Sequence, residues 1–123
     1  MVLEWLDGEF AVAKWTRDRK IEELGCFSFW SRTDQELSLV CPKDCLPEDA
    51  EKQEGGWAGF RVVGQMDFTL VGILAKISGS LAEKKISIFA ISTFDTDYVF
   101  IKENDANAAQ KALESMDFDF IKK

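Results

Sequence analysis

The chain has 123 residues, of which 46% are hydrophobic, and its ten Phe and four Trp supply enough apolar surface for a packed interior. Its formal net charge of -7 makes the surface repel the phosphate groups of nucleic acids and of anionic lipids. No segment approaches the ~20 apolar residues that cross a bilayer, the first residues lack the pattern of a secretory signal, and three cysteines do not make a disulfide framework. We therefore expect a cytoplasmic protein with neither nucleic acid nor membrane as a partner.

The first 56 residues predict short strands. Residues 10–15 are rich in aromatic and apolar side chains and indicate a strand. Residues 26–30 and 37–40 indicate a hairpin around the polar residues 32–35. This half is acidic, because residues 1–56 carry 13 acidic and 7 basic side chains.

Helix is sparse in the same half. Residues 17–24 can form at most a helical turn or two. Residues 47–53 predict a short helix, because Pro47 suits a first turn and the acidic residues suit a helix N-terminus. The next strand, at residues 57–63, would close this half and also open the second.

The second half is clearer. Residues 59–63 predict a strand bounded by glycines, and a loop leads from Gly64 to a helix that runs from Thr69, a plausible N-cap, to about Lys84. Five apolar residues of this helix recur with the 3.6-residue period of one buried face. They are Leu70, Ile73, Leu74, Ile77 and Leu81.

A hairpin follows the helix. Residues 86–94 predict a strand, whose nearly continuous apolar start is typical of a central position in a sheet. Residues 95–97 predict a tight turn, since Asp side chains bond readily to nearby backbone amides. Residues 98–102 are the partner strand of this hairpin.

A second helix and a last strand complete the chain. The helix is capped by Asn104 or Asp105 and runs to about Met116, and residues 118–121 form the strand. The side chains expected to face inward from this helix are Ala106, Ala109, Leu113 and Met116. The order β-α-β-β-α-β predicts an α+β fold of the ferredoxin-like type, a four-stranded antiparallel sheet with two helices on one face.

The second half resembles the ACT domain family. The resemblance is carried by the acidic loop and glycine of residues 67–77 (DFTLVGILAKI), the Leu-Ala pair at 81–82, and the strand at 86–88. Residues 91–100 (ISTFDTDYVF) further resemble the ACT units of small bacterial and archaeal proteins, of cytosolic arginine sensors and of the regulatory part of aspartate kinases. We expect two ACT-like units: a degenerate one at residues 1–56 and an ACT domain at 57–123.

The resemblance implies amino-acid sensing. In such domains a ligand usually sits between two ACT units, against the loop before the first helix and the second strand of the facing unit. Carried over, this implies ligand-binding residues on the loop, namely Gln65, Met66, Asp67, Phe68, Thr69, Val71 and Gly72. On the strand it implies Ile88, Phe89, Ala90, Ile91 and Ser92.

Elementary chemistry agrees with this site, although each residue also has a structural interpretation. A helix N-terminus presents N–H groups that suit a carboxylate, and Asp67 could pair with an α-amino group or cap the helix beside Thr69. Gly72 could admit a ligand close to the backbone or serve only for packing. Many ACT domains have Pro before this glycine where this chain has Val71. Asp95 and Asp97 are expected to be turn formers.

No catalytic, metal or cofactor site is expected. The chain has no His, the commonest general base at neutral pH, and no motif of a phosphate loop or nucleophile elbow is present. Cys41 and Cys45 are spaced C-x3-C, but a structural zinc site needs four ligands, usually Cys and His.

The sequence leaves three functions open. The first is a regulatory sensor without catalytic activity, whose expected partners are a free amino acid and a regulated protein. The second is a ligand-free dimerisation or protein-interaction module, and the third binds another small molecule such as a purine or a keto acid. A homodimer is expected because edge strands leave backbone donors and acceptors open.

Overall fold

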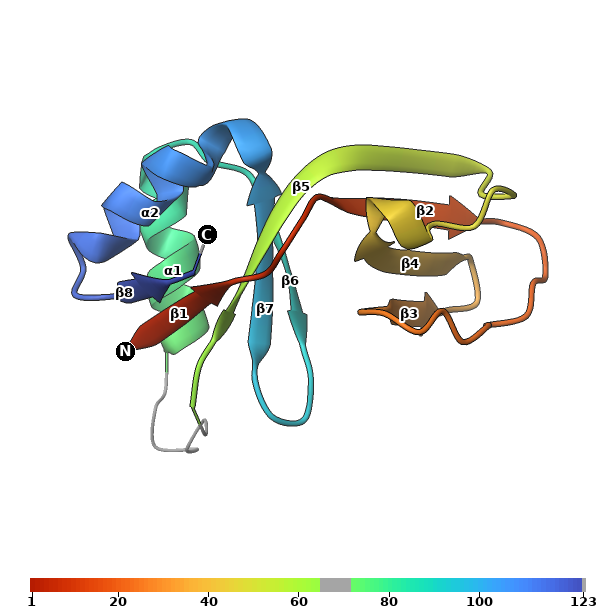
Figure 1. The fold of residues 1–123 in the computed structure, drawn as a ribbon, viewed down its shortest axis with the longest axis horizontal. Helices are drawn as coiled ribbons and strands as arrows, with labels where there is room; N and C mark the ends of the chain where they lie inside the picture. Colours follow the sequence, from red (N-terminus) through yellow and green to blue (C-terminus); the bar gives the residue numbers. More distant parts are fainter. Residues whose placement is uncertain (65–71, 123) are drawn as a thin grey trace. The chain divides into compact units, whose positions relative to one another are not determined.

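The structure is a computed structural model that describes residues 1–64 and 72–122. These residues form eight strands linked through pairing into one sheet, two α-helices and two short 3-10 helices, so the expected α+β class is confirmed (Figure 1). The chain divides into two compact units, unit 1 (Met1–Asp7 and Ala58–Lys123) and unit 2 (Gly8–Trp57). Residues 1–7, assigned to the N-terminal part from the sequence, thus pack in unit 1.

The sheet of unit 1 has the strand order β8-β1-β5-β7-β6. Its members are β1 (Val2–Trp5), β5 (Lys52–Val62), β6 (Ile88–Ser92), β7 (Asp97–Lys102) and β8 (Asp119–Ile121). β1 pairs antiparallel with β5 and parallel with β8. The prediction of a four-stranded, fully antiparallel sheet is therefore wrong. The sheet has a fifth strand, β1, which was not predicted; it lies between β5 and β8 and is parallel to β8.

The helices of unit 1 are α1 (Ile73–Glu83) and α2 (Ala106–Glu114). α1 begins later than residue 69, with Gly72 as its N-cap in the left-handed conformation (φ 88°), and Thr69 lies outside the described residues. Ile77 and Leu81 are fully buried, as the apolar period predicts, and they pack over one sheet face together with α2 (Figure 1).

α2 follows a 3-10 helix (Glu103–Asp105) and has Asp105 as its N-cap, one of the two residues predicted. Its inward side is formed by Ala106, Ala109 and Leu113, as predicted, and also by Ala112. Met116 does not face inward, because the helix ends at Glu114, and its side chain is 43% exposed.

An aromatic cluster anchors the core of unit 1. Trp5 stacks on Phe120 with ring centroids 5.1 Å apart and meets Phe60 edge-on at 5.3 Å. Trp5 Nε1 donates a hydrogen bond of 2.8 Å to Gln110 Oε1 on α2. The unpredicted strand β1 therefore contributes a central residue of the core, and its indole N–H is satisfied, as burial requires.

β6 is an edge strand and not the central strand that its apolar sequence suggested. It pairs with β7 and with no other described strand. Its side chains are half-buried or exposed. The apolar run was misleading because both faces of this edge strand are partly covered. Its sequence, like that of a central strand, therefore shows little alternation between apolar and polar residues.

Unit 2 is an antiparallel sheet of order β3-β4-β2-β5, in which the first part of β5 is its last strand. The other members are β2 (Phe10–Trp15), β3 (Phe29–Arg32) and β4 (Leu37–Pro42). The predicted strand at 10–15 and the predicted hairpin are confirmed. β5 thus belongs to both units, as the shared strand predicted at 57–63 required.

Unit 2 contains no α-helix among residues 8–57, so the plan of two helices on one face does not hold for it. The helix predicted for residues 47–53 is wrong, because β5 begins at Lys52 and Gln53 already pairs with Ala13. Residues 17–24 are irregular, and the only helical element is the 3-10 helix Lys43–Cys45.

The core of unit 2 lies on one face of its sheet. Trp15, Leu37, Leu39 and Cys41 are buried there. Half-buried residues from the irregular segments at 16–28 and 43–50 pack against them. These residues are Leu24, Cys45, Leu46 and Ala50. Irregular chain thus covers this face, where helices cover the sheet of unit 1.

Candidate ligand-binding site

A cavity of about 500 Å³ lies in unit 1, at the end of β5 that precedes residues 65–71. Three strands and the β6–β7 turn contribute to its wall. The lining residues are Glu4, Arg61, Val62, Val63, Gly64, Asp95, Thr96 and Tyr98. The cavity therefore collects charged groups of both signs beside the strand end.

Strand alternation explains why polar residues gather at this cavity. Phe60 and Val62 on β5 belong to the core beneath the helices, so Arg61 points to the opposite face. Glu4 is the direct partner of Arg61 in the antiparallel pair of β1 and β5. The same argument turns Tyr98 away from the helices, because its neighbour Val99 is in the core.

A charged network connects three elements at this wall. Arg61 donates from Nε and from Nη2 to Glu4 Oε1, each at 2.8 Å, and Lys122 Nζ lies 3.0 Å from Glu4 Oε2. Hydrogen bonds from Lys122 and then from Arg61 lower the pKa of Glu4. Hydrogen bonds with Tyr98 and then with Glu4 raise the pKa of Arg61. Arg61 is therefore held in place and fully charged.

The β6–β7 turn is braced against β5. Thr96 Oγ1 donates a hydrogen bond of 2.7 Å to the Val62 carbonyl, and the backbone N–H of Thr93 donates to the Thr96 carbonyl at 2.9 Å. The sequence predicted Asp97 in the turn, but this residue is the first of β7 and is 6% exposed. It accepts a hydrogen bond of 2.6 Å from Ser92 Oγ. Asp95, in the same turn, lines the cavity.

The predicted binding residues are only partly visible. Gln65, Met66, Asp67, Phe68, Thr69 and Val71 lie outside the described residues. Gly72 has open space where a Cβ atom would stand, and its positive φ suits glycine. Ile88, Phe89, Ala90, Ile91 and Ser92 lie along β6, and none of them lines the cavity. Their part in binding stays a prediction.

Sequence reasoning missed Glu4, Arg61 and Tyr98. Arg61 and Tyr98 lie in strands that were correctly predicted. The sequence did not indicate which strands pair with these two, so it did not bring Arg61 and Tyr98 together with Glu4. In Val2–Trp5 only the last three residues alternate between apolar and polar, which is too short a run to indicate β1 and with it Glu4.

The three cysteines are free thiols near one another in unit 2. Burial, followed by the neighbouring thiols, raises the pKa of Cys41 to about 12. Burial and then Cys45 raise the pKa of Cys26 to about 11. Among residues 1–64 and 72–122 no group of three or more His, Cys, Asp or Glu side chains could hold a metal ion.

Comparison with known proteins identifies the family. The profile of the ACT domain family matches residues 52–115, and the chain belongs to the ACT domain family. The resemblance predicted from residues 57–116 is thus confirmed. A comparison with curated proteins gave no match.

Solved structures extend the likeness over the whole chain. A crystal structure of a protein from Agobacterium tumefaciens is 30% identical, with a TM-score of 0.89 over 98% of this chain and 91% of that one. The ligand-free regulatory subunit of aspartate kinase from Thermus thermophilus has a TM-score of 0.69 at 14% identity, over 92% and 95% of the two chains. A structure of aspartokinase alpha and beta subunits gives 0.67 at 16%, over 94% and 96%. The last two show similarity of fold alone.

No helix in the described part of the chain is long and apolar enough to cross a membrane. The longest, α1, has 11 residues, about half of the ~20 that a transmembrane helix needs.

Proposed function

We propose that this ACT-family chain is a regulatory protein that binds a free amino acid and has no catalytic activity of its own. Family membership and the fold shared with an aspartate kinase regulatory subunit support a regulatory, ligand-binding role. The absence of His from the sequence supports binding over acid–base catalysis.

The observation that carries the proposal is the mixed charge of the cavity in unit 1. Arg61 and Asp95 both line it, and the guanidinium of the one suits an α-carboxylate while the carboxylate of the other suits an α-ammonium group. Its volume of about 500 Å³ is within the range of roughly 300–1,000 Å³ typical of small-molecule sites. A zwitterion such as a free amino acid can pair with both Arg61 and Asp95.

The site also adjoins the predicted loop. Gly64 lines the cavity and directly precedes Gln65, the first of the ligand-binding residues implied by the family resemblance. We propose that Asp67 and its neighbours complete the site, and that β6 contributes through the facing unit of a second copy.

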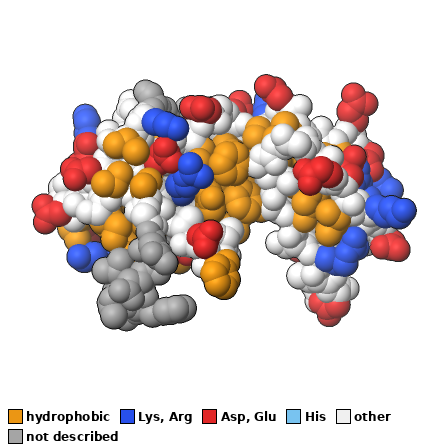
Figure 2. All heavy atoms as spheres, turned by 60° about the horizontal axis from the view of Figure 1, so that its bottom comes forward, with side chains coloured by type: hydrophobic (Ala, Val, Ile, Leu, Met, Phe, Trp, Pro, Cys, Tyr) orange, Lys and Arg blue, Asp and Glu red, His pale blue; other side chains and the backbone are white. Residues whose placement is uncertain are grey.

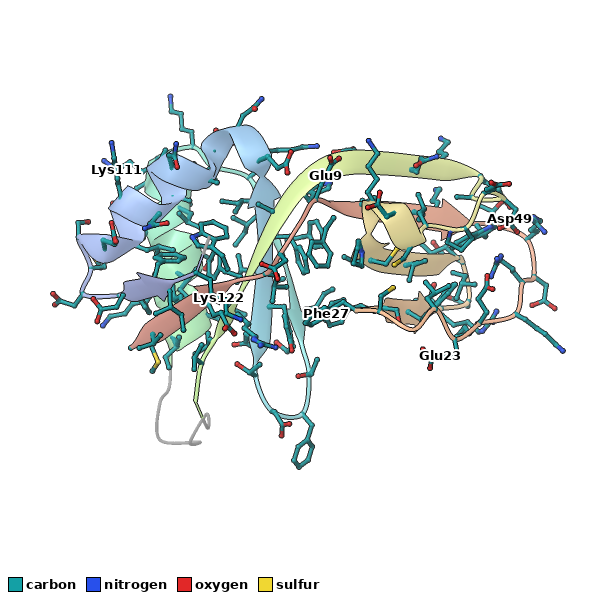
Figure 3. All side chains as sticks on the ribbon, in the orientation of Figure 1. Glu9, Glu23, Phe27, Asp49, Lys111 and Lys122 are labelled. Carbon is teal, nitrogen blue, oxygen red and sulfur yellow. The ribbon has the colours of Figure 1, made fainter. Side chains whose placement is uncertain are left out.

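A thermal-shift screen against the twenty amino acids, with purines and keto acids added, tests this function. A ligand at about 100 times its Kd adds about 2.7 kcal/mol, enough for a rise of several degrees in Tm. We expect one or two amino acids to raise the Tm, and Asp95→Asn to weaken their binding at least tenfold by calorimetry. Lys111→Gln, on the exposed side of α2 (Figure 3), should bind as the wild type does.

Two outcomes of this screen are informative in different ways. Loss of binding in Asp67→Asn but not in Asp95→Asn would move the site from the cavity to the loop. A flat panel with folded protein would contradict the amino-acid proposal, and a purine or keto acid as the sole hit would replace the ligand class.

A second function, as a protein-interaction module, is favoured by Phe94. This side chain is fully exposed in the braced β6–β7 turn, and a large exposed aromatic residue on a rigid support is typical of a contact anchor. We propose a homodimer that uses this turn, with a regulated protein as a possible further partner. Sedimentation of the wild type should give a dimer at micromolar concentration and Phe94→Ser a monomer. A monomeric wild type would contradict this.

We further propose a cytoplasmic location and no nucleic-acid or membrane partner. Three free thiols fit a reducing compartment. Acidic and basic side chains are interspersed on the face drawn in Figure 2, and the net charge of -7 opposes binding to phosphate-rich surfaces.

A further inference from the structure

In unit 2, the side chain of Arg19 is largely buried and contacts both aromatic rings and carboxylates. Arg19 lies in the irregular segment of residues 16–28, over the sheet face that carries the core. Its side chain is only 14% exposed, whereas that of Arg17, two residues earlier, is 53% exposed. Burial of a guanidinium to this extent requires dedicated partners.

The guanidinium of Arg19 lies over the rings of two tryptophans. Its Cζ lies 4.6 Å from the ring centroid of Trp15 and 5.8 Å from that of Trp30. The two rings stack on one another, with centroids 5.7 Å apart and planes 23° apart. Both distances are within the ~6 Å at which a cation is attracted to an aromatic ring.

The same guanidinium donates four hydrogen bonds to oxygen acceptors. Nε donates to Asp49 Oδ2 at 2.9 Å and Nη2 donates to Oδ1 at 3.0 Å, a bidentate pair. Nη2 also donates to Glu22 at 2.8 Å, and Nη1 donates to the Lys20 carbonyl at 2.8 Å. Aromatic faces with a bidentate carboxylate edge match the shape of a guanidinium and not that of an ammonium group.

The sheet side of this site has a hydrogen bond that does not involve Arg19. Trp15 is fully buried on β2, and its Nε1 donates to the Asp49 carbonyl at 3.0 Å. Asp49, labelled in Figure 3, lies in the chain that leads to β5, and Trp30 is on β3. Glu22 and Lys20 belong to the same segment as Arg19. The rings and the bidentate carboxylate therefore come from outside the segment that supplies the cation.

We propose that Trp15, Trp30 and Asp49 form a guanidinium-binding site in which Arg19 is the intramolecular occupant. When Arg19 occupies the site, it holds residues 16–28 against the core of unit 2. A guanidinium supplied from outside competes for the same place, and its binding releases this segment, because one site cannot hold both groups. The ligand class is a monoalkyl guanidinium cation, such as an arginine side chain. The site is separate from the cavity of unit 1 and does not depend on the proposed function.

Chemical rescue of the full chain tests this site. Arg19→Ala should lower the Tm, and ethylguanidinium at tens of millimolar should raise the Tm of this variant, saturably, while it leaves or lowers that of the wild type. Ethylammonium at equal concentration should give no rise, because it lacks the planar fork. The tryptophan fluorescence of Arg19→Ala should change with the same half-saturation, since Trp15 and Trp30 form the walls.

Two further variants make the result decisive. Asp49→Asn in the Arg19→Ala background should abolish the rescue, and Arg17→Ala should show no rescue, because Arg17 contacts Asp49 and Glu51 but neither ring. If Arg19→Ala does not fold, circular dichroism should show that ethylguanidinium restores the fold and ethylammonium does not. Equal effects of the two cations, or rescue that survives Asp49→Asn, would overturn the site.

Discussion

The two units bury one face of a sheet in different ways. In unit 1, α1 and α2 place apolar side chains such as Leu81 and Leu113 over the strands. In unit 2, irregular segments cover the face and make many polar contacts, including four hydrogen bonds donated by Arg19, two of them to Asp49. A helix satisfies its own backbone and can present an apolar stripe, whereas irregular chain needs side-chain partners to stay in place.

This difference predicts how each unit fails. Unit 1 should be sensitive to the volume of its core side chains, as close-packed interiors are. Unit 2 should be sensitive to single charged residues and to pH. The ACT-family match includes only the β5 part of unit 2.

The largest expected effect separates two leucines. Leu81 on α1 is fully buried, whereas Leu24 in the 16–28 segment is half-buried. Leu81→Ala should lower the free energy of unfolding by about 2–5 kcal/mol. Leu24→Ala should cost less than about half of that, because the irregular segment can close over the lost volume. Urea denaturation of both variants measures this, and an equal loss would remove the distinction between helix and segment.

Arg19 and Arg17 provide the polar counterpart of that pair. Arg19→Ala should lower the free energy of unfolding by about 1–3 kcal/mol, since it loses the bidentate pair with Asp49 and the contact with two rings. Arg17→Ala, which loses an exposed pair, should cost less than about 1 kcal/mol. Hydrogen exchange should quicken over residues 16–28 in the first variant and not in the second. If Arg17→Ala lowered the free energy of unfolding more than Arg19→Ala, then Arg17 and not Arg19 would hold the segment in place.

The sequence predicted the helical unit better than the irregular one. The apolar period of Ile77 and Leu81 identified α1 because a helix records its buried face in its own sequence. β1 was missed because four residues carry little periodicity, although Trp5 is central to the core. The edge position of β6 was not predictable, since pairing partners are set by tertiary structure.

The cavity of unit 1 was not predictable from local sequence patterns. The cavity depends on the cross-strand pair of Glu4 and Arg61, which lie 57 positions apart in the chain, and no local pattern connects them. Likewise, Arg19 and Asp49 are 30 positions apart. Interpreting 47–53 as a helix placed Asp49 on the wrong element and concealed its carboxylate as the partner of Arg19.

Acid should act on unit 2 through Asp49. Hydrogen bonds from Arg19 lower the pKa of this carboxyl group to about 2 from its usual 3.8. The folded state thus favours the charged form, so its stabilising contribution is present above pH ~4 and is lost as the pH falls towards 2. The stability difference between wild type and Asp49→Asn should therefore shrink over this range in urea denaturation at several pH values. A constant difference would exclude the ion pair as its source.

The thiols should react slowly in the folded chain. The pKa of Cys26 is raised to about 11 from its usual 9.0, which lowers the thiolate fraction at pH 8 about 100-fold. Cys41 is raised further, to about 12, and is fully buried. Iodoacetamide labelling followed by mass spectrometry should therefore modify Cys41 only on unfolding and Cys26 far more slowly than a model thiol. Fast labelling of Cys41 would mean that the covering of unit 2 opens readily.

The smallest effect should differ in sign between the units. Gly79 lies within α1 and nothing stands within 4 Å of a Cβ atom added there, so Gly79→Ala should raise the free energy of unfolding by up to about 1 kcal/mol. Gly25 in the irregular segment has equal room but a φ of +71°, so Gly25→Ala should lower it by roughly 1 kcal/mol. Urea denaturation of the two variants compares them directly. Because space is equal at both sites, opposite signs would show that backbone conformation, regular in one unit and irregular in the other, decides the outcome.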